Sequence, residues 1–254
     1  MSDPHLLADP FGRYRGRRPH DLLRHGLQRC RASADGAAAR AELRLLGGVL
    51  CQDESWVGYA RLRDLLDEML PAGLPVALLA GNHDHPQLLR AVLGRQAVIA
   101  PACLRLGGWQ VLLLDSHRPG ETGGELGSRQ LQWLERQLSR ADGPVLVAVH
   151  HPPVAIGHPE LDAIRLRDGA ALLDLLCRSE WVRAVVFGHV HQHWRGSLPA
   201  RQAIPLLACP SSLCAFRAVQ PCPLGREQDP GGRMLELLPS GTVRDRLLRW
   251  HPPD

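Results

Sequence analysis

Continuous apolar segments alternate along the chain with stretches of helical periodicity. The apolar segments are not interrupted by polar residues at every second position, which is typical of strands that are buried on both faces. We expect strands at Val76–Ala80, Val111–Leu114, Val145–Val149, Ala184–Phe187 and Ile204–Ala208. We expect helices at about Asp21–Arg31, Trp56–Leu70, Pro86–Leu93, Ser128–Ser139 and Asp168–Cys177. This alternation of strands with helices predicts an α/β architecture.

The C-terminal part of the chain follows a different pattern. Met234–Pro239 and Thr242–Trp250 are separated at Pro-Ser-Gly, which predicts a hairpin. Neither an internal repeat nor a linker divides the sequence. We therefore expect residues 1–254 to form a single domain.

Composition narrows the range of functions. The net charge is +4, and all the basic residues are arginines, of which only Arg13, Arg15, Arg17 and Arg18 form a cluster. Aromatic residues make up 4% of the chain, so stacking platforms for nucleic acid are few, and we expect no nucleic-acid partner. No apolar run approaches the roughly 18 residues needed to span a bilayer, and no signal peptide is readable. We expect a cytoplasmic protein without a membrane partner, whose seven singly spaced cysteines are reduced.

Three of the expected strands end directly in loops that carry histidine. These loops are Gly81–Asp84, His150–Pro153 and Gly188–His191. Open α/β sheets place their functional sites just past the carboxyl ends of strands. Imidazole, amide and carboxylate donors suit Zn, Mn, Fe, Ni or Co. In an extended segment, the spacing of His189 and His191 would put both rings on one face.

Each of these motifs also has a purely structural interpretation. A lone His-His-Pro is more often a surface or core feature than a metal site, and a lone His-x-His is an even choice. All three motifs in this order, each at a strand end, make a chance origin improbable. The sequence therefore predicts a metal site.

The order Asp3-Pro4-His5, Gly81-Asn82-His83-Asp84, His150-His151-Pro152 and Gly188-His189-Val190-His191 resembles the calcineurin-like metallophosphoesterases. Within that family the chain looks most similar to the bacterial class III cyclic-AMP phosphodiesterases. Leu50–Asp53, Leu112–Ser116, Gly124–Leu126 and His191-Gln192 carry the closer resemblance, which covers nearly the whole chain.

The resemblance implies a four-layer αββα sandwich with two divalent metal ions, most often Fe, Mn or Zn, at the strand ends. By motif match, one ion would be bound by Asp3, His5 and His191, and the other by Asn82, His150 and His189. The resemblance makes His83 the catalytic residue beside the phosphate, and gives substrate contacts to His5, Asn82, His83 and His191. Two dications ~3.5–4 Å apart would polarise the phosphoryl group and supply hydroxide, opening a cyclic nucleotide to the 5′-monophosphate.

Val49 departs from the family pattern. The family has an aspartate here that bridges both metals, whereas valine has no donor atom. Two dications ~3.7 Å apart repel by about 18 kcal/mol at an effective dielectric constant of about 20, a crude upper scale. A bridging carboxylate helps to offset this repulsion, and Asp53 is not expected to replace it. We hypothesise that the binuclear centre is impaired and holds its second metal weakly.

The start of the chain is a second departure. The family has a strand before its Asp-x-His motif, and here only Met1 and Ser2 precede Asp3. We therefore expect a sandwich that lacks its first strand, because the start is assigned too late or because this copy is decaying.

Three functions remain open. The chain is an active phosphodiesterase of cyclic nucleotides, a metallophosphoesterase of another phosphodiester, or a non-catalytic relative that binds nucleotide or one metal. The retained donor positions favour the first two, whereas Val49 and the missing strand favour the third.

Overall fold

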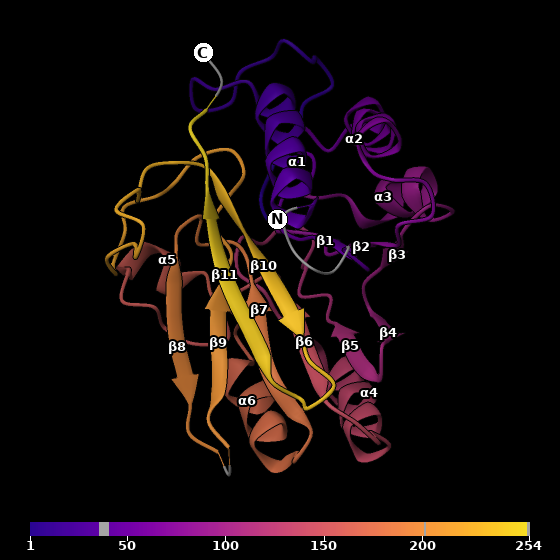
Figure 1. The fold of residues 1–254 in the computed structure, drawn as a ribbon, viewed down its shortest axis with the longest axis vertical. Coiled ribbons are helices and arrows are strands. Elements are labelled where there is room, and N and C mark those ends of the chain that lie inside the picture. The colour runs from indigo at the N-terminus through magenta and orange to yellow at the C-terminus, as the bar shows by residue number, and fades with distance from the viewer. Residues whose placement is uncertain (36–40, 201, 253–254) are drawn as a thin grey trace.

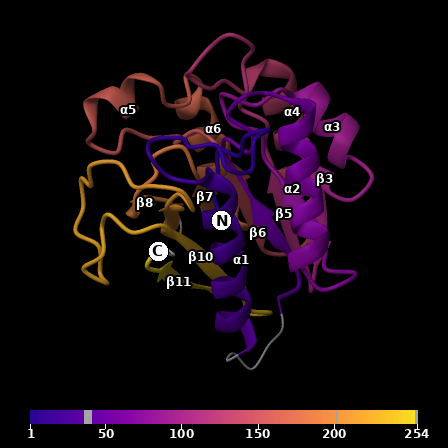
Figure 2. The same cartoon turned by 90° about the horizontal axis from the view of Figure 1, so that it is seen from above.

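The computed structural model describes residues 1–35, 41–200 and 202–252 (Figures 1 and 2). Its helices are α1 (Pro19–Asp35), α2 (Trp56–Met69), α3 (Pro86–Leu93), α4 (Gly127–Ser139), α5 (Pro159–Ala163) and α6 (Gly169–Arg178). Its strands are β1 (Arg44–Leu46), β2 (Val76–Leu78), β3 (Val98–Ile99), β4 (Ala102–Leu106), β5 (Trp109–Leu113), β6 (Val145–Val149), β7 (Val182–Phe187), β8 (Trp194–Leu198), β9 (Ile204–Ala208), β10 (Gly231–Leu237) and β11 (Val243–Arg249).

The largest sheet has six strands in the order β4-β5-β6-β7-β9-β8. Its central strands β5, β6, β7 and β9 are parallel, and an antiparallel strand closes each edge. All residues of β5 and β6 are buried, as expected of continuous apolar strands. One core packs α4 and α6 against this sheet through Leu134, Leu172 and Leu176.

A second layer of strands faces the six-stranded sheet. It contains the parallel sheet β1-β2-β3 and the antiparallel hairpin β10-β11. Apolar residues between the two layers form one core, to which β2 contributes Ala77 and β10 contributes Leu235. A further core, with Leu23 and Leu62, covers the other face of β1 and β2 with α1, α2 and α3. The four layers confirm the expected αββα sandwich.

All five expected strands and the C-terminal hairpin are present, with bounds that shift by a few residues. The N-terminus of α4 has no cap from the side chain of its own N-cap residue, Leu126. The carboxylate of Asp168, which precedes α6, instead accepts hydrogen bonds from the Leu126 and Gly127 backbone N–H groups. This long-range cap ties α4 to α6 beneath the sheet.

Residues 1–6 lie beside the loop that follows β1. Ser2 bridges in parallel to both Gly47 and Ser211, and Leu6 bridges to Cys51. The Met1 ammonium group donates to the carbonyl oxygen of Leu45 in β1 at 2.9 Å. Among the described residues, β1 and β10 are not paired with each other, so the second layer is in two pieces on either side of this segment.

No helix in the described part of the chain is both long enough and apolar enough to cross a membrane.

The core under the six-stranded sheet offers a direct test of the packing. Leu172 of α6 is fully buried there. Leu172→Ala is expected to lower the free energy of unfolding by about 2–5 kcal/mol, because the lost methyl groups leave a cavity. Urea unfolding followed by circular dichroism measures the change. The matched control is Leu224→Ala, whose side chain is largely exposed, and an equal effect of both changes would contradict this packing.

Candidate metal centre

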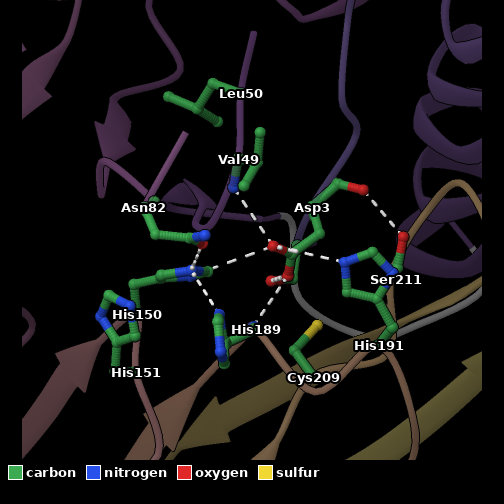
Figure 3. Close-up of polar contacts among 12 residues, drawn as sticks. Asp3, Val49, Leu50, Asn82, His150, His151, His189, His191, Cys209 and Ser211 are labelled. Carbon is green, nitrogen blue, oxygen red and sulfur yellow. Dashed lines mark hydrogen bonds and ion pairs between the residues drawn. The ribbon is translucent and has the colours of Figure 1, made fainter. Parts of the chain in front are cut away.

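Two groups of side chains whose donor atoms converge lie near the carboxyl ends of the strands, and each could hold a metal ion (Figure 3). Asp3 and His5 come from the segment before α1, Asn82 and His83 follow β2, His150 follows β6, and His189 and His191 follow β7. Four separate segments of the chain thus supply the donors, and the strand ends of both inner layers bring them together.

The first group is Asp3, His5 and His191, all of them buried. The Nε2 atoms of His5 and His191 are 3.0 Å apart, and Nε2 of His191 is 3.7 Å from Oδ1 of Asp3. Nδ1 of His5 lies 2.7 Å from Oε1 of Gln52, and Nδ1 of His191 lies 3.1 Å from the carbonyl oxygen of Cys214. With Nδ1 as the donor in both rings, each neutral imidazole directs the lone pair of Nε2 toward the other. A cation between these facing acceptors suits this arrangement.

The second group is Asn82, His150 and His189. Nε2 of His150 is 3.3 Å from Oδ1 of Asn82 and 3.2 Å from Nδ1 of His189. The other ring nitrogens, Nδ1 of His150 and Nε2 of His189, are buried without a hydrogen-bond partner among the described residues. Buried polar atoms are rarely left in this state. The three converging atoms, Oδ1 of Asn82, Nε2 of His150 and Nδ1 of His189, are a donor set that fits a divalent metal ion.

Asp3 links the two groups. Its carboxylate accepts hydrogen bonds from the backbone N–H of Val49 at 3.2 Å, from that of His189 at 3.0 Å, and from the Ser2 hydroxyl. Nδ1 of His150 lies 4.0 Å from Oδ1. Burial alone would raise the pKa of Asp3, but His191, His5 and the Ser2 hydroxyl bring it below its usual value. The carboxylate is therefore charged at neutral pH.

Burial keeps the imidazoles of both groups neutral. Loss of hydration on burial, and after it the unfavourable charging of two rings as close as His5 and His191, lowers the pKa of His5 to about 3. Burial also lowers the pKa of His189 and of His191 to about 4, and that of His150 well below its ordinary value. Metal ions bind the unprotonated ring, so these histidines need no proton release near pH 7.

Four of the donors adopt a backbone conformation that side chains rarely take. The φ angles are +50° at Asp3, +51° at His5, +68° at His189 and +54° at His191. The expectation of an extended segment that places His189 and His191 on one face is therefore wrong. The left-handed turns direct His191 to the first group and His189 to the second.

His83 lies beside these groups without being part of either. It is half-buried and lines a hollow of about 700 Å³ together with Asn82, Arg90 and His117. The ring of His117 is fixed because its Nδ1–H donates to the carbonyl oxygen of Gly81 at 2.9 Å. The hollow is within the usual size range for small-molecule sites, so it offers room for the organic part of a substrate.

Asp84, the last residue of the Gly81–Asp84 loop, has a structural role. Its carboxylate accepts from the backbone N–H groups of Leu50, Cys51 and Gly81 and from the Tyr59 hydroxyl. These bonds fix the loop that carries Asn82 and His83.

Val49 contributes only its backbone to the site. Its backbone N–H group donates to the Asp3 carboxylate. The preceding residue, Gly48, has a φ of +92° and lies so close to that carboxylate that a side chain there would collide with it. Asp53 does not replace a bridging carboxylate, because it is exposed and accepts from the Ala8 N–H and the Ser55 hydroxyl. The two donor groups therefore share a single carboxylate, that of Asp3.

His151 is a buried residue of the site that the sequence did not single out. Its ring centre lies 4.6 Å from that of His150 and 4.7 Å from that of His189. Nδ1 accepts from the Ser116 hydroxyl at 2.8 Å, and Nε2–H donates to the carbonyl oxygen of Thr122 at 3.1 Å. Because both nitrogens are occupied, His151 supports the second group instead of binding a metal. The paired histidines were its only sequence signal.

Comparisons with known proteins agree with this geometry. A family model described as calcineurin-like phosphoesterase matches residues 46–193. A probable cyclic nucleotide phosphodiesterase of Synechococcus sp. (strain WH7803) is 48% identical over 98% of this chain and 95% of its own length. The 3′,5′-cyclic adenosine monophosphate phosphodiesterase CpdA of Pseudomonas aeruginosa is 33% identical over 98% of this chain and 88% of its own.

Solved structures share the fold at low sequence identity. A dimetal phosphatase from Danio rerio superposes with a TM-score of 0.62 and 17% identity over 98% of this chain and 97% of its own. A purple acid phosphatase from yellow lupin superposes with a TM-score of 0.58 and 15% identity, over 84% of this chain and 44% of its own. The chain belongs to the calcineurin-like phosphoesterase family.

Proposed function

We propose that this chain is a metal-dependent phosphodiesterase that hydrolyses a 3′,5′-cyclic nucleotide to the 5′-monophosphate in the bacterial cytoplasm. The observation that carries the proposal is the convergence of buried, neutral histidines and Asn82 on the charged carboxylate of Asp3, next to His83 and the hollow. The relatives at 48% and 33% identity are named for cyclic-nucleotide hydrolysis, which supports this substrate class.

In this proposal each donor group has its own metal ion. Asp3, His5 and His191 would hold one divalent ion, and Asn82, His150 and His189 would hold the other. When bound, such ions polarise the phosphoryl group and lower the pKa of bound water. The hydrogen bonds of His5 to Gln52 and of His191 to Cys214 orient both rings and fix their tautomers. His5, Asn82 and His191 would also contact the phosphate.

His83 carries the proton chemistry in this proposal. It follows Asn82 directly and faces the hollow, where it can donate a proton to the departing ribose oxygen or stabilise charge on the phosphate. His83→Ala is expected to lower kcat for cyclic AMP by about 100- to 10,000-fold while the bound metal is retained. The rate of 5′-AMP formation and the metal content by mass spectrometry test both parts.

A histidine on the same loop gives the matched control. His85 is the N-cap residue of α3, and its Nδ1 accepts from the Leu88 N–H. Because His85 also lines the hollow, His85→Ala is expected to raise KM more than it lowers kcat and not to reproduce the loss of kcat in His83→Ala. Loss of metal from the His83→Ala protein would contradict the assignment, because His83 would then be a ligand.

The substrate class is tested by product analysis. The metal-loaded protein is incubated with Mn²⁺ and either cyclic AMP or the general diester bis(p-nitrophenyl) phosphate. Formation of 5′-AMP supports the proposal. Hydrolysis of the general diester alone would replace it with a phosphodiesterase of another substrate.

Val49 favours a second candidate, a non-catalytic relative that binds nucleotide or one metal. The donor set has one carboxylate, and valine offers no replacement. Isothermal titration with cyclic AMP, followed by analysis of the nucleotide recovered after hours, distinguishes the candidates. A binding protein leaves cyclic AMP intact, whereas an enzyme converts it to 5′-AMP.

A further inference from the structure

A tight turn of arginines lies beside the first donor group. The backbone N–H of Tyr14 donates to the Arg17 carbonyl at 2.9 Å, and that of Arg17 donates to the Tyr14 carbonyl at 3.0 Å. The two residues between them, Arg15 and Gly16, have φ angles of +50° and +74°. This is the two-residue hairpin that favours Asn or Gly at both central positions. Arginine at the first of them is strained, and strained side-chain positions concentrate at functional sites.

The turn is joined to the donor group by stacked rings. Tyr14 stacks on His5 with ring centres 4.9 Å apart, and Phe216 stacks on His191 at 4.1 Å with an interplanar angle of 3°. The guanidinium carbon of Arg15 lies 4.9 Å from the centre of the Phe216 ring and 5.6 Å from that of Tyr14. The guanidinium group therefore contacts the rings that cover both imidazoles.

The charge of Arg15 is not neutralised within the described residues, where the structure records no carboxylate within ion-pair distance of it. Arg18 differs, because it pairs with Asp21 at 3.5 Å. Arg13 supports the turn by donating to the Gly16 carbonyl at 2.8 Å. A guanidinium that stacks through its face keeps its N–H edge available for an anion.

We propose that Arg15 binds the phosphate group of the substrate and of the product from the His5–His191 end of the centre. This inference rests on the proposed function for the identity of the anion as a phosphate ester. Arg15 would act at the end of the site defined by the first donor group, whereas His83 acts from the loop of Asn82. Planar guanidinium groups make directional, charge-assisted hydrogen bonds to phosphate oxygens.

The experiment measures binding of inorganic phosphate to the Mn²⁺-loaded protein by isothermal titration calorimetry. Arg15→Met keeps an unbranched side chain to pack on the rings but removes the charge and all donors. It is expected to weaken phosphate binding about 10- to 100-fold, as for loss of a hydrogen bond to a charged group. Arg15→Lys keeps the charge and is expected to lose less. Arg15→Gly removes the side chain without backbone strain and is expected to match Arg15→Met.

Arg18→Met is the matched control, because it removes the same charge from the same loop at a residue that pairs elsewhere. Phosphate binding by Arg15→Met at the wild-type level would overturn the proposal, because packing alone would then suffice. An equal loss in Arg18→Met would also overturn it, since the effect would be one of net charge. Phosphate binding does not require cyclic-nucleotide hydrolysis. If 5′-AMP does not form but phosphate binding depends on Arg15, the proposed substrate fails while the anion site stands.

Discussion

Val49→Asp is expected to increase metal binding from one tightly held ion per chain to two, and to raise kcat/KM for the diester by about 100-fold or more. The backbone N–H of Val49 donates to the carboxylate of Asp3, which lies between the two donor groups. An aspartate side chain at position 49 would therefore start next to both groups. A second carboxylate would reduce the repulsion between two dications. Lewis-acid stabilisation of the transition state is worth several kcal/mol, and about 1.4 kcal/mol is a tenfold change in rate.

Metal content by inductively coupled plasma mass spectrometry and the rate of 5′-AMP formation measure both effects. Val49→Asn is the matched control, since it has the shape of aspartate without the charge, and a much smaller gain is expected. Two tightly bound ions in the unmodified protein would contradict the impaired centre. Unchanged activity after the second ion binds would show that the weakly held second ion does not limit the rate of hydrolysis.

Asp3→Asn is expected to weaken metal binding by about 100-fold or more and to leave about 1% of the activity or less. Asp3 is the only carboxylate in the two donor groups, and it lies within 4 Å of a ring nitrogen from each. The amide keeps the shape but loses the charge, and its NH₂ group cannot accept the backbone N–H bonds that the carboxylate holds. Charge-assisted hydrogen bonds are about twice as strong as neutral ones.

Equilibrium dialysis with Mn²⁺ and the cyclic-AMP assay test this prediction. The matched control is Asp64→Asn, an exposed carboxylate paired with Arg63, which is expected to change neither quantity. Full metal affinity in the Asp3→Asn protein would exclude Asp3 as a ligand.

The sequence predicted the central strands and the loops that carry the donors, because buried strands and histidine motifs are local signals. The parallel strands then bring Asn82, His150 and His189 to the same edge, as the topology requires. Short strands with mixed burial, such as β1 and β8, carry no comparable signal. Their positions depend on pairing with distant strands, which a local pattern does not contain.

Interactions between distant residues were also beyond the sequence. The cap that Asp168 gives to α4 joins residues about forty positions apart. The stack of Phe216 on His191 and the approach of Arg15 to Phe216 join segments that only the fold brings together. The family resemblance predicted the donor residues. The aromatic rings and the arginine that surround them are brought together only by the fold.

The left-handed backbone at four donors has a consequence for the stability of the fold. A non-glycine residue in this conformation costs about 1–2 kcal/mol, and glycine would relieve that cost. At Asp3, His5, His189 and His191 this backbone cost is set against the hydrogen bonds and ring contacts that their side chains make. The left-handed backbone at these four positions is therefore a cost in stability that the fold carries where it places the side chains of the centre.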